Sequence, residues 1–195
     1  MVLGGSNVDR DLDRLGAAKR WLTMLEVVVF RGDLMVEVLE KYPLLHYIGV
    51  DPYWYDPYDS GRYTNDVAQL REAKKIARER QQKYGMNRRA SLLRMPSLVA
   101  LWEAPIDIDL VHLTGEQRET AVVLDLLAWS KKVRPGGILC GHNWGMWDSV
   151  NSAVTLCRDR WFPDWEFDTC GNTWALIRPA EPGAFWPRIE KTPSN

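Results

Sequence analysis

The stretch Trp129-Ser-Lys-Lys-Val-Arg-Pro-Gly-Gly-Ile-Leu-Cys-Gly-His-Asn-Trp144 joins the end of one predicted element to the whole of the next. Proline and two glycines stop the apolar helical run before them, because proline lacks an amide donor and glycine accepts turn conformations. Residues 138–140 then form a short apolar strand, and polar residues follow it. A helix, a turn, a buried strand and a polar loop in this order are typical of one unit of an α/β sheet.

The same unit recurs on the amino-terminal side of this stretch. Nearly continuous apolar runs predict strands that are buried on both faces, and helical periodicity follows them. The predicted strands are residues 24–30, 46–51, 89–94, 107–112 and 138–140, and the predicted helices are residues 9–21, 33–42, 65–84, 120–133 and 147–160, with another opening at 96–97. Residues 165–169 and 173–178 alternate around Cys170-Gly171-Asn172, which predicts a hairpin. The fold class is therefore α/β: a doubly wound, mostly parallel seven-stranded sheet with a C-terminal antiparallel hairpin.

Length and composition limit the class of protein. The 195 residues fit one domain, and 46% hydrophobic with 26% charged residues exclude a disordered chain. The net charge of −1 argues against a dedicated nucleic-acid binder, and the apolar runs are too short to cross a bilayer. We expect a single domain over residues 1–195, with an N-terminal helical segment (1–22), a core (23–179) and a C-terminal tail (180–195).

The three cysteines, Cys140, Cys157 and Cys170, form no Cys-x-x-Cys pair. The sequence therefore predicts no zinc site, and we interpret them as small buried hydrophobic residues. An odd cysteine count without an apolar signal segment favours a reducing, cytoplasmic compartment.

Polar or small residues follow the predicted strands. Because ligands bind beyond the carboxyl ends of the strands in doubly wound sheets, these positions are the candidate site. They are residues 26–32, Asp51, Ser97, residues 112–115 and residues 141–144.

Five segments carry a resemblance to a known family: Glu26-Val-Val-Val-Phe-Arg-Gly32, Tyr47-Ile-Gly-Val-Asp-Pro-Tyr-Trp54, Met95-Pro-Ser97, Ile108-Asp-Leu-Val-His-Leu-Thr-Gly115 and residues 129–144. Together they resemble the class I S-adenosylmethionine-dependent methyltransferases, and among these the small-molecule type. The resemblance covers residues 25–178. It implies a Rossmann-like fold, S-adenosylmethionine as cofactor and a small-molecule hydroxyl or amine as methyl acceptor.

The resemblance places Glu26, Gly32, Asp51, Ser97 and Thr114 along the cofactor. Asp51 suits the two ribose hydroxyls, or alternatively caps the turn before Pro52. Glu26 would be a costly buried charge unless it pairs with the backbone of the next loop or with a ligand amine. Gly32 opens a helix whose N-terminus favours anionic groups. Ser97 either contacts adenine or serves as a helix N-cap.

Three positions depart from the family pattern. Val28 replaces a glycine beside the cofactor, and overpacking there costs ~1–3 kcal/mol, or roughly 5- to 150-fold in affinity. Thr114 and Asn143 replace the two acids that hold a divalent ion in metal-dependent relatives. Since such ions need hard oxygen ligands, the sequence argues against a divalent metal.

The acceptor side of the site follows the fifth strand. His142 is the candidate general base for removing a proton from the acceptor, and a capped or packed histidine is the alternative. Trp54, Asn143 and Trp144 are the candidate substrate-binding residues.

Two functions therefore stay open. One is an active methyltransferase acting on a small molecule, without membrane or nucleic-acid partners. The other is a catalytically inactive protein of the same fold that serves as a structural or interaction subunit, with protein subunits or further copies of itself as partners. Val28, Thr114, Asn143 and the ten tryptophans favour the second.

Overall fold

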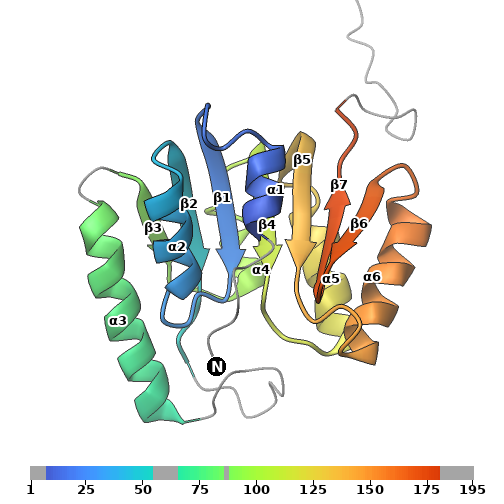
Figure 1. Cartoon of the computed structure of the whole chain (residues 1–195). Coiled ribbons are helices and arrows are strands. Elements are labelled where there is room, and N and C mark those ends of the chain that lie inside the picture. The colour runs from blue at the N-terminus through green and yellow to red at the C-terminus, as the bar shows by residue number, and fades with distance from the viewer. Residues whose placement is uncertain (1–7, 55–65, 86–87, 181–195) are drawn as a thin grey trace, which may run out of the picture.

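A computed structural model describes residues 8–54, 66–85 and 88–180, and these form alternating strands and helices (Figure 1). The helices are α1 (Val8–Arg14), α2 (Asp33–Lys41), α3 (Val67–Gly85), α4 (Ser97–Ala100), α5 (Glu119–Trp129) and α6 (Asp148–Trp161). The strands are β1 (Leu22–Val27), β2 (Leu45–Val50), β3 (Ala90–Leu93), β4 (Ile108–Leu113), β5 (Val133–Gly141), β6 (Glu166–Cys170) and β7 (Thr173–Ile177).

The seven strands form one sheet in the order β3-β2-β1-β4-β5-β7-β6. Strands β1 to β5 run parallel to one another, and β7 pairs antiparallel with both β5 and β6. This confirms the predicted doubly wound, mostly parallel sheet and its C-terminal antiparallel hairpin. The order reverses beside β1, because the chain runs through β2 and β3 on one side and returns to β4 on the other.

Several predicted boundaries were wrong. The first helix ends at Arg14 rather than at residue 21, and the helix predicted to reach residue 133 ends at Trp129. The fifth strand is longer than predicted, since Val133–Gly141 includes Pro135 and both glycines, with a register shift opposite β4. The first strand ends at Val27 rather than at Phe30. Val28 and Phe30 have φ angles of 72° and 51°, so the chain leaves the extended conformation there.

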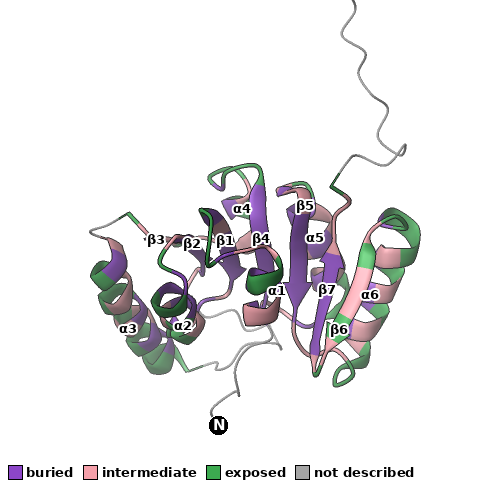
Figure 2. Ribbon diagram, turned by 45° about the horizontal axis from the view of Figure 1, so that its top comes forward, coloured by how far each residue is buried: buried purple, intermediate pink, exposed green. Residues whose placement is uncertain are grey.

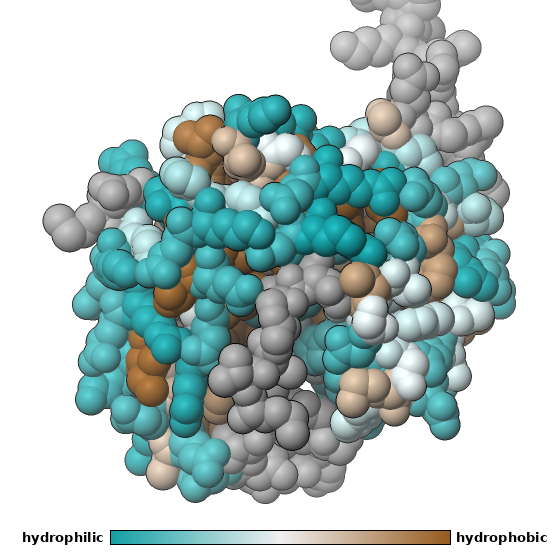
Figure 3. Space-filling view, in the orientation of Figure 1, coloured by the Kyte–Doolittle hydropathy of each residue, from teal (hydrophilic) through white to brown (hydrophobic). Residues whose placement is uncertain are grey.

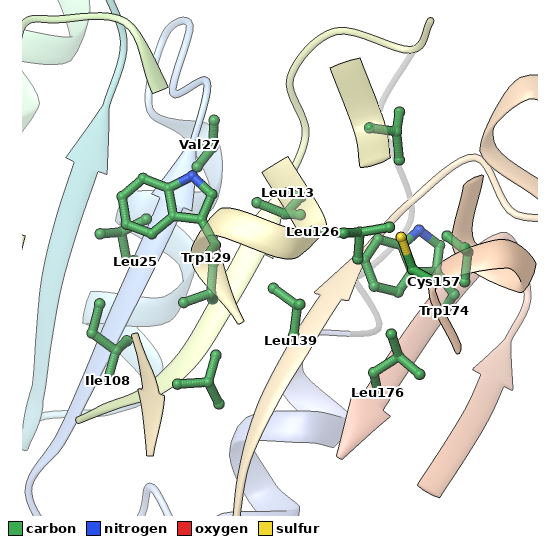
Figure 4. Close-up of a cluster of buried hydrophobic side chains, with 14 of the residues drawn as sticks. Leu25, Val27, Ile108, Leu113, Leu126, Trp129, Leu139, Cys157, Trp174 and Leu176 are labelled. Atoms are coloured by element: carbon green, nitrogen blue, oxygen red, sulfur yellow. The ribbon is translucent and has the colours of Figure 1, made fainter. Parts of the chain in front are cut away.

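Buried apolar side chains form one layer on each face of the sheet. Figure 2 shows that the central strands of the sheet are mostly buried. Helices α1 and α2 cover the first face, where Leu12 and Met35 are buried, and α4, α5 and α6 cover the second. Figure 4 shows the second layer, in which Trp129 and Trp174 are the largest fully buried side chains. Cys140 and Cys157 are buried as expected, whereas Cys170 is only half-buried.

The outer surface over α1, α2 and α3 is mainly hydrophilic (Figure 3). Within the described ranges, each helix is either too short or too polar to cross a bilayer.

Candidate functional site

A cavity of about 440 Å³ opens beyond the carboxyl ends of β1 and β2 and reaches the start of α5. It lies where the strand order reverses, which is the expected ligand position in this kind of sheet. Its walls are mostly apolar, with acidic groups among them. The lining residues used below are Val28, Asp51, Trp54, Ser97, Gly115, Leu124 and Asp125. Of the predicted site residues, the cavity therefore brings together Asp51, Ser97 and Trp54.

The loop between β1 and α2 turns through three left-handed residues. Val28, Phe30 and Gly32 have φ angles of 72°, 51° and 75°. Glycine adopts this conformation freely, but a β-branched valine does so at a cost of roughly 1–2 kcal/mol. Val28 therefore has a backbone conformation that favours glycine, and it lies at the cavity wall.

Asp51 binds the backbone of this loop. Its Oδ2 accepts hydrogen bonds from the amides of Val29 (3.1 Å) and Phe30 (2.9 Å), and its Oδ1 accepts one from the amide of Tyr53 (2.8 Å). The bond to Tyr53 is the local turn anticipated as the alternative role of Asp51. The bonds to the loop were not anticipated, and they order the cavity wall.

Thr114 binds the other side of the same loop. Its hydroxyl donates to the carbonyl of Val27 at 2.5 Å and lies 2.9 Å from the carbonyl oxygen of Val28. Its amide also donates to the carbonyl of Val27 (3.1 Å). An ionised aspartate at this position has no proton to donate. The hydrogen bond from the threonine hydroxyl to the loop carbonyls is therefore one that an aspartate could not make.

Glu26 lies on the face of β1 opposite the cavity. It is 5% exposed, and burial raises its pKa to about 8. The predicted partners were backbone amides or a ligand amine. In the structure the Tyr47 hydroxyl donates to Glu26 Oε2. His112 Nδ1 lies 4.0 Å from Glu26 Oε1, beyond hydrogen-bond distance.

Two polar atoms close to this carboxyl are buried and lack a hydrogen-bond partner among the described residues, namely His112 Nδ1 and the Tyr53 hydroxyl. Burial, with a contribution from His142, lowers the pKa of His112 to about 3, so its ring is neutral. Burial and the neighbouring Asp51 and Glu26 raise the pKa of Tyr53. Unsatisfied buried groups of this kind are uncommon in folded proteins.

The interpretation of Ser97 as a helix N-cap was wrong. Pro96 occupies the N-cap position of α4, and Ser97 is the first helical residue. The Ser97 hydroxyl donates to Asp125 Oδ1 (2.6 Å) and accepts from Trp129 Nε1 (2.8 Å). Asp125 was missed in the sequence, although a single acid inside an apolar helical run signals a special environment.

The predicted acceptor residues lie beyond the carboxyl end of β5. His142 is half-buried, with its ring centre 6.1 Å from that of His112, and burial lowers its pKa. It borders a small hollow that also contacts Asp125 and Gly115. His142 is therefore mainly neutral at pH 7 and able to accept a proton.

Asn143 and Trp144 contact other parts of the protein. Asn143 has a φ of 66°, and its Nδ2 donates to Gln117 Oε1 (3.0 Å). Trp144 packs edge-on against Phe167, with ring centres 5.1 Å apart. Trp54, by contrast, is 51% exposed at the cavity wall. The four predicted acceptor-side residues thus do not line one common cavity.

Gly32 lies outside the cavity lining, at the N-cap of α2. Its φ of 75° favours glycine, whereas an added Cβ would approach only the terminal methyl of the flexible Met35 side chain, at 2.8 Å. In the part of the chain that the structure describes, no three His, Cys, Asp or Glu side chains are grouped closely enough to hold a metal ion.

Comparison with known proteins gives a family match. The family model described as "Methyltransferase domain" matches residues 32–144, more than half of the chain. No curated protein sequence matches the chain.

Solved structures share the fold at low sequence identity. The O-methyltransferase NovP superposes with a TM-score of 0.61 at 18% identity, covering 89% of this chain and 78% of its own. The SAH-bound methyltransferase PaMTH1 of Podospora anserina has a TM-score of 0.58 at 14% identity, covering 82% and 72%. Precorrin-6y C5,15-methyltransferase of Geobacter metallireducens has a TM-score of 0.57 at 12% identity, covering 91% and 90%.

Proposed function

Because the chain belongs to the methyltransferase domain family, we propose that it transfers a methyl group from S-adenosylmethionine to a hydroxyl or amine of a small molecule. The observation that carries this proposal is the cavity of about 440 Å³ at the reversal of strand order, with Asp51 at its wall. The SAH-bound relative of the same fold supports the choice of cofactor.

The residues at the cavity fit this cofactor. Its volume lies within the range of small-molecule sites, and its walls combine apolar side chains with a few polar groups. Asp51, at the cavity wall, would accept hydrogen bonds from the ribose hydroxyls. When bound, the cofactor supplies an electrophilic methyl group.

The chain's own contribution to catalysis would be orientation and proton removal. His142 is neutral at pH 7 because burial lowers its pKa, and it would accept the proton of the acceptor hydroxyl or amine. Trp54 would contact the acceptor at the cavity wall, whereas Asn143 and Trp144 would hold the loop that carries His142. Since methyl transfer is an in-line displacement, positioning accounts for much of the rate.

Calorimetry with S-adenosylhomocysteine tests the proposal. We expect micromolar binding by the wild type and loss of binding in Asp51→Ala, because the carboxylate orders the cavity wall and faces the ligand. Asp164→Asn, a change in an exposed acid away from the cavity, is the matched control. Absence of binding by the folded wild type at millimolar ligand would contradict the proposal.

One observation favours a second candidate, an inactive protein that uses this fold as an interaction subunit. Val28 lies at the cavity wall in a strained backbone conformation. If the wild type fails to bind the ligand while a folded Val28→Gly variant binds it, the valine is the cause and the second function holds. Binding by both supports the enzyme.

A further inference from the structure

Asp125 is the one acid inside an otherwise apolar stretch of α5. The helix reads Glu-Thr-Ala-Val-Val-Leu-Asp-Leu-Leu-Ala-Trp, and Asp125 lines the cavity together with Ala121 and Leu124. Placing a carboxylate in such surroundings is costly unless the group is hydrogen-bonded. Hydrogen bonding within the protein satisfies one of the two oxygens of this carboxylate.

A short chain of hydrogen bonds fixes one oxygen of Asp125. Trp129 Nε1 donates to Ser97 Oγ at 2.8 Å, and Ser97 Oγ donates to Asp125 Oδ1 at 2.6 Å. The indole has one N–H and the hydroxyl has one proton. Both protons are therefore used, and Ser97 has none left to donate to a ligand.

The second oxygen remains available. Among the described residues no group donates a hydrogen bond to Asp125 Oδ2, and the adjacent loop residue is Gly115, whose absent Cβ would lie 3.5 Å from this oxygen. The backbone next to Oδ2 therefore carries no side chain, and the oxygen borders the cavity. Burial raises the pKa of Asp125 to about 6, so the group is mainly ionised at pH 7.5 and acts as an acceptor only.

The ligand atom that satisfies Oδ2 must be a donor. Asp51 already lines the cavity from the end of β2, where it suits the ribose hydroxyls, whereas Asp125 comes from α5 on a different wall. The same cavity is also lined by the apolar residues Leu98, Ala121 and Leu124, which suit a flat ring. A ring that carries an N–H donor at its edge matches both features, and the adenine of the proposed cofactor has such a donor in its exocyclic amino group.

We infer that Asp125 selects the purine in this cavity by accepting a hydrogen bond from the exocyclic amino group, and that Ser97 and Trp129 are positioning residues for this carboxylate. The inference rests on the proposed function, because it takes the adenine of the cofactor as the ligand. It changes the predicted role of Ser97 from direct contact to the orientation of Asp125.

The test compares two ligands that differ at one group. S-adenosylhomocysteine carries the 6-amino group, and its deaminated analogue S-inosylhomocysteine carries a 6-oxo group that would face the carboxylate with a second acceptor. We expect the wild type to bind the amino compound at least ~10-fold more tightly, because a hydrogen bond to a charged group is lost and repulsion replaces it. The readout is the ratio of the two dissociation constants from calorimetry at pH 7.5.

Variants then test whether Asp125 causes this ratio of dissociation constants. In Asp125→Asn the amide can donate to the 6-oxo group, so the ratio should fall towards one or invert. Ser97→Ala should reduce the ratio by a smaller factor, because Oδ1 loses its donor and the carboxylate is less firmly held. Asp164→Asn should leave the ratio unchanged, and thermal unfolding of each variant confirms that it is folded.

The outcomes separate the two proposals. Failure of the folded wild type to bind S-adenosylhomocysteine removes the proposed function and this inference together. Binding with a wild-type ratio below about two, or with an unchanged ratio in folded Asp125→Asn, overturns the inference and leaves the proposed function standing. If Asp125→Asn does not fold, the wild-type ratio alone decides.

Discussion

The hydroxyl of Thr114 lies 2.9 Å from the carbonyl oxygen of Val28, in a loop whose valine has a φ of 72°. Two departures from the family pattern, separate in sequence, therefore meet in one contact. Together with the Asp51 carboxylate on the amides of Val29 and Phe30, this contact holds the loop in a conformation that valine alone disfavours.

Replacing Val28 by glycine should tighten binding of S-adenosylhomocysteine by about 10-fold. The side chain leaves the cavity wall, and overpacking of this kind is worth ~1–3 kcal/mol. Stability should change little, because the released strain of roughly 1–2 kcal/mol is offset by lost burial and by the flexibility of glycine in the unfolded chain. Calorimetry and thermal unfolding measure the two effects, and Val36→Gly in α2 should destabilise without tightening binding. Unchanged affinity in Val28→Gly would show that the valine leaves room for the ligand.

Removing only the hydroxyl of Thr114 should destabilise the protein. Thr114→Val keeps the shape but leaves two carbonyl groups without this donor, at a cost of about 1–3 kcal/mol. Thr114→Ser keeps the donor and should lose less. Urea unfolding of the two variants gives the difference. Equal stability of the valine and serine variants would mean that the hydroxyl contributes nothing to holding the loop.

Glu26 should make the protein less stable as the pH rises towards 8. Its folded pKa of about 8 exceeds the usual 4.5, so the folded state binds the extra proton, and stability is lost between these values. His112, with a folded pKa of about 3, acts in the opposite direction but only below pH 6.5. The effect of Glu26 is therefore isolated between pH 6.5 and 8, where we expect a loss on the order of 1–2 kcal/mol.

Urea unfolding at several pH values checks this expectation. Glu26→Gln keeps an acceptor for the Tyr47 hydroxyl and has no charge, so its stability should stay flat between pH 6.5 and 8. A wild-type curve with the same slope as that of the glutamine variant would show that Glu26 does not titrate in this range.

His142 should titrate below pH 6.5, because burial disfavours the imidazolium form. Proton NMR of the histidine ring signals, assigned by the loss of one set in His142→Asn, measures this directly. His112 should show no titration between pH 5 and 8, given its pKa of about 3. A His142 pKa above 6.5 would mean that the ring is more solvated than the structure has it, and would weaken its role as a base at neutral pH.

The sequence was sufficient to predict how the strands and helices alternate, because apolar runs buried on both faces and helical periodicity are local patterns. The hairpin around Cys170-Gly171-Asn172 was predicted for the same reason and is confirmed as β6 and β7. The end of β1 was not predictable from apolar character. Val28, Val29 and Phe30 continue the apolar run, and bonds from Asp51 and Thr114, distant in sequence, set their conformation.

Part of the candidate site was also predicted from local patterns in the sequence. Asp51, Ser97 and Trp54 follow strand ends, and the topology brings them to one cavity. The pairing of Ser97 with Asp125 needed knowledge of how α5 packs against α4, and no local pattern contains it. Glu26 was correctly identified as requiring a partner, but its partner Tyr47 comes from the neighbouring strand, so only the sheet register shows it.

The contact between Thr114 and Val28 also has a consequence for the order in which substitutions can be made. An aspartate at position 114 would oppose the carbonyl oxygens of Val27 and Val28 while the valine still needs to be held, so Thr114→Asp alone should be strongly unfavourable. With glycine at position 28 the strain is gone, and the same change should cost less by ~0.5–3 kcal/mol, the range of coupling between residues in contact. The effects of the two substitutions are thus coupled. A stepwise return to the family pattern should cost less stability when Val28→Gly precedes Thr114→Asp.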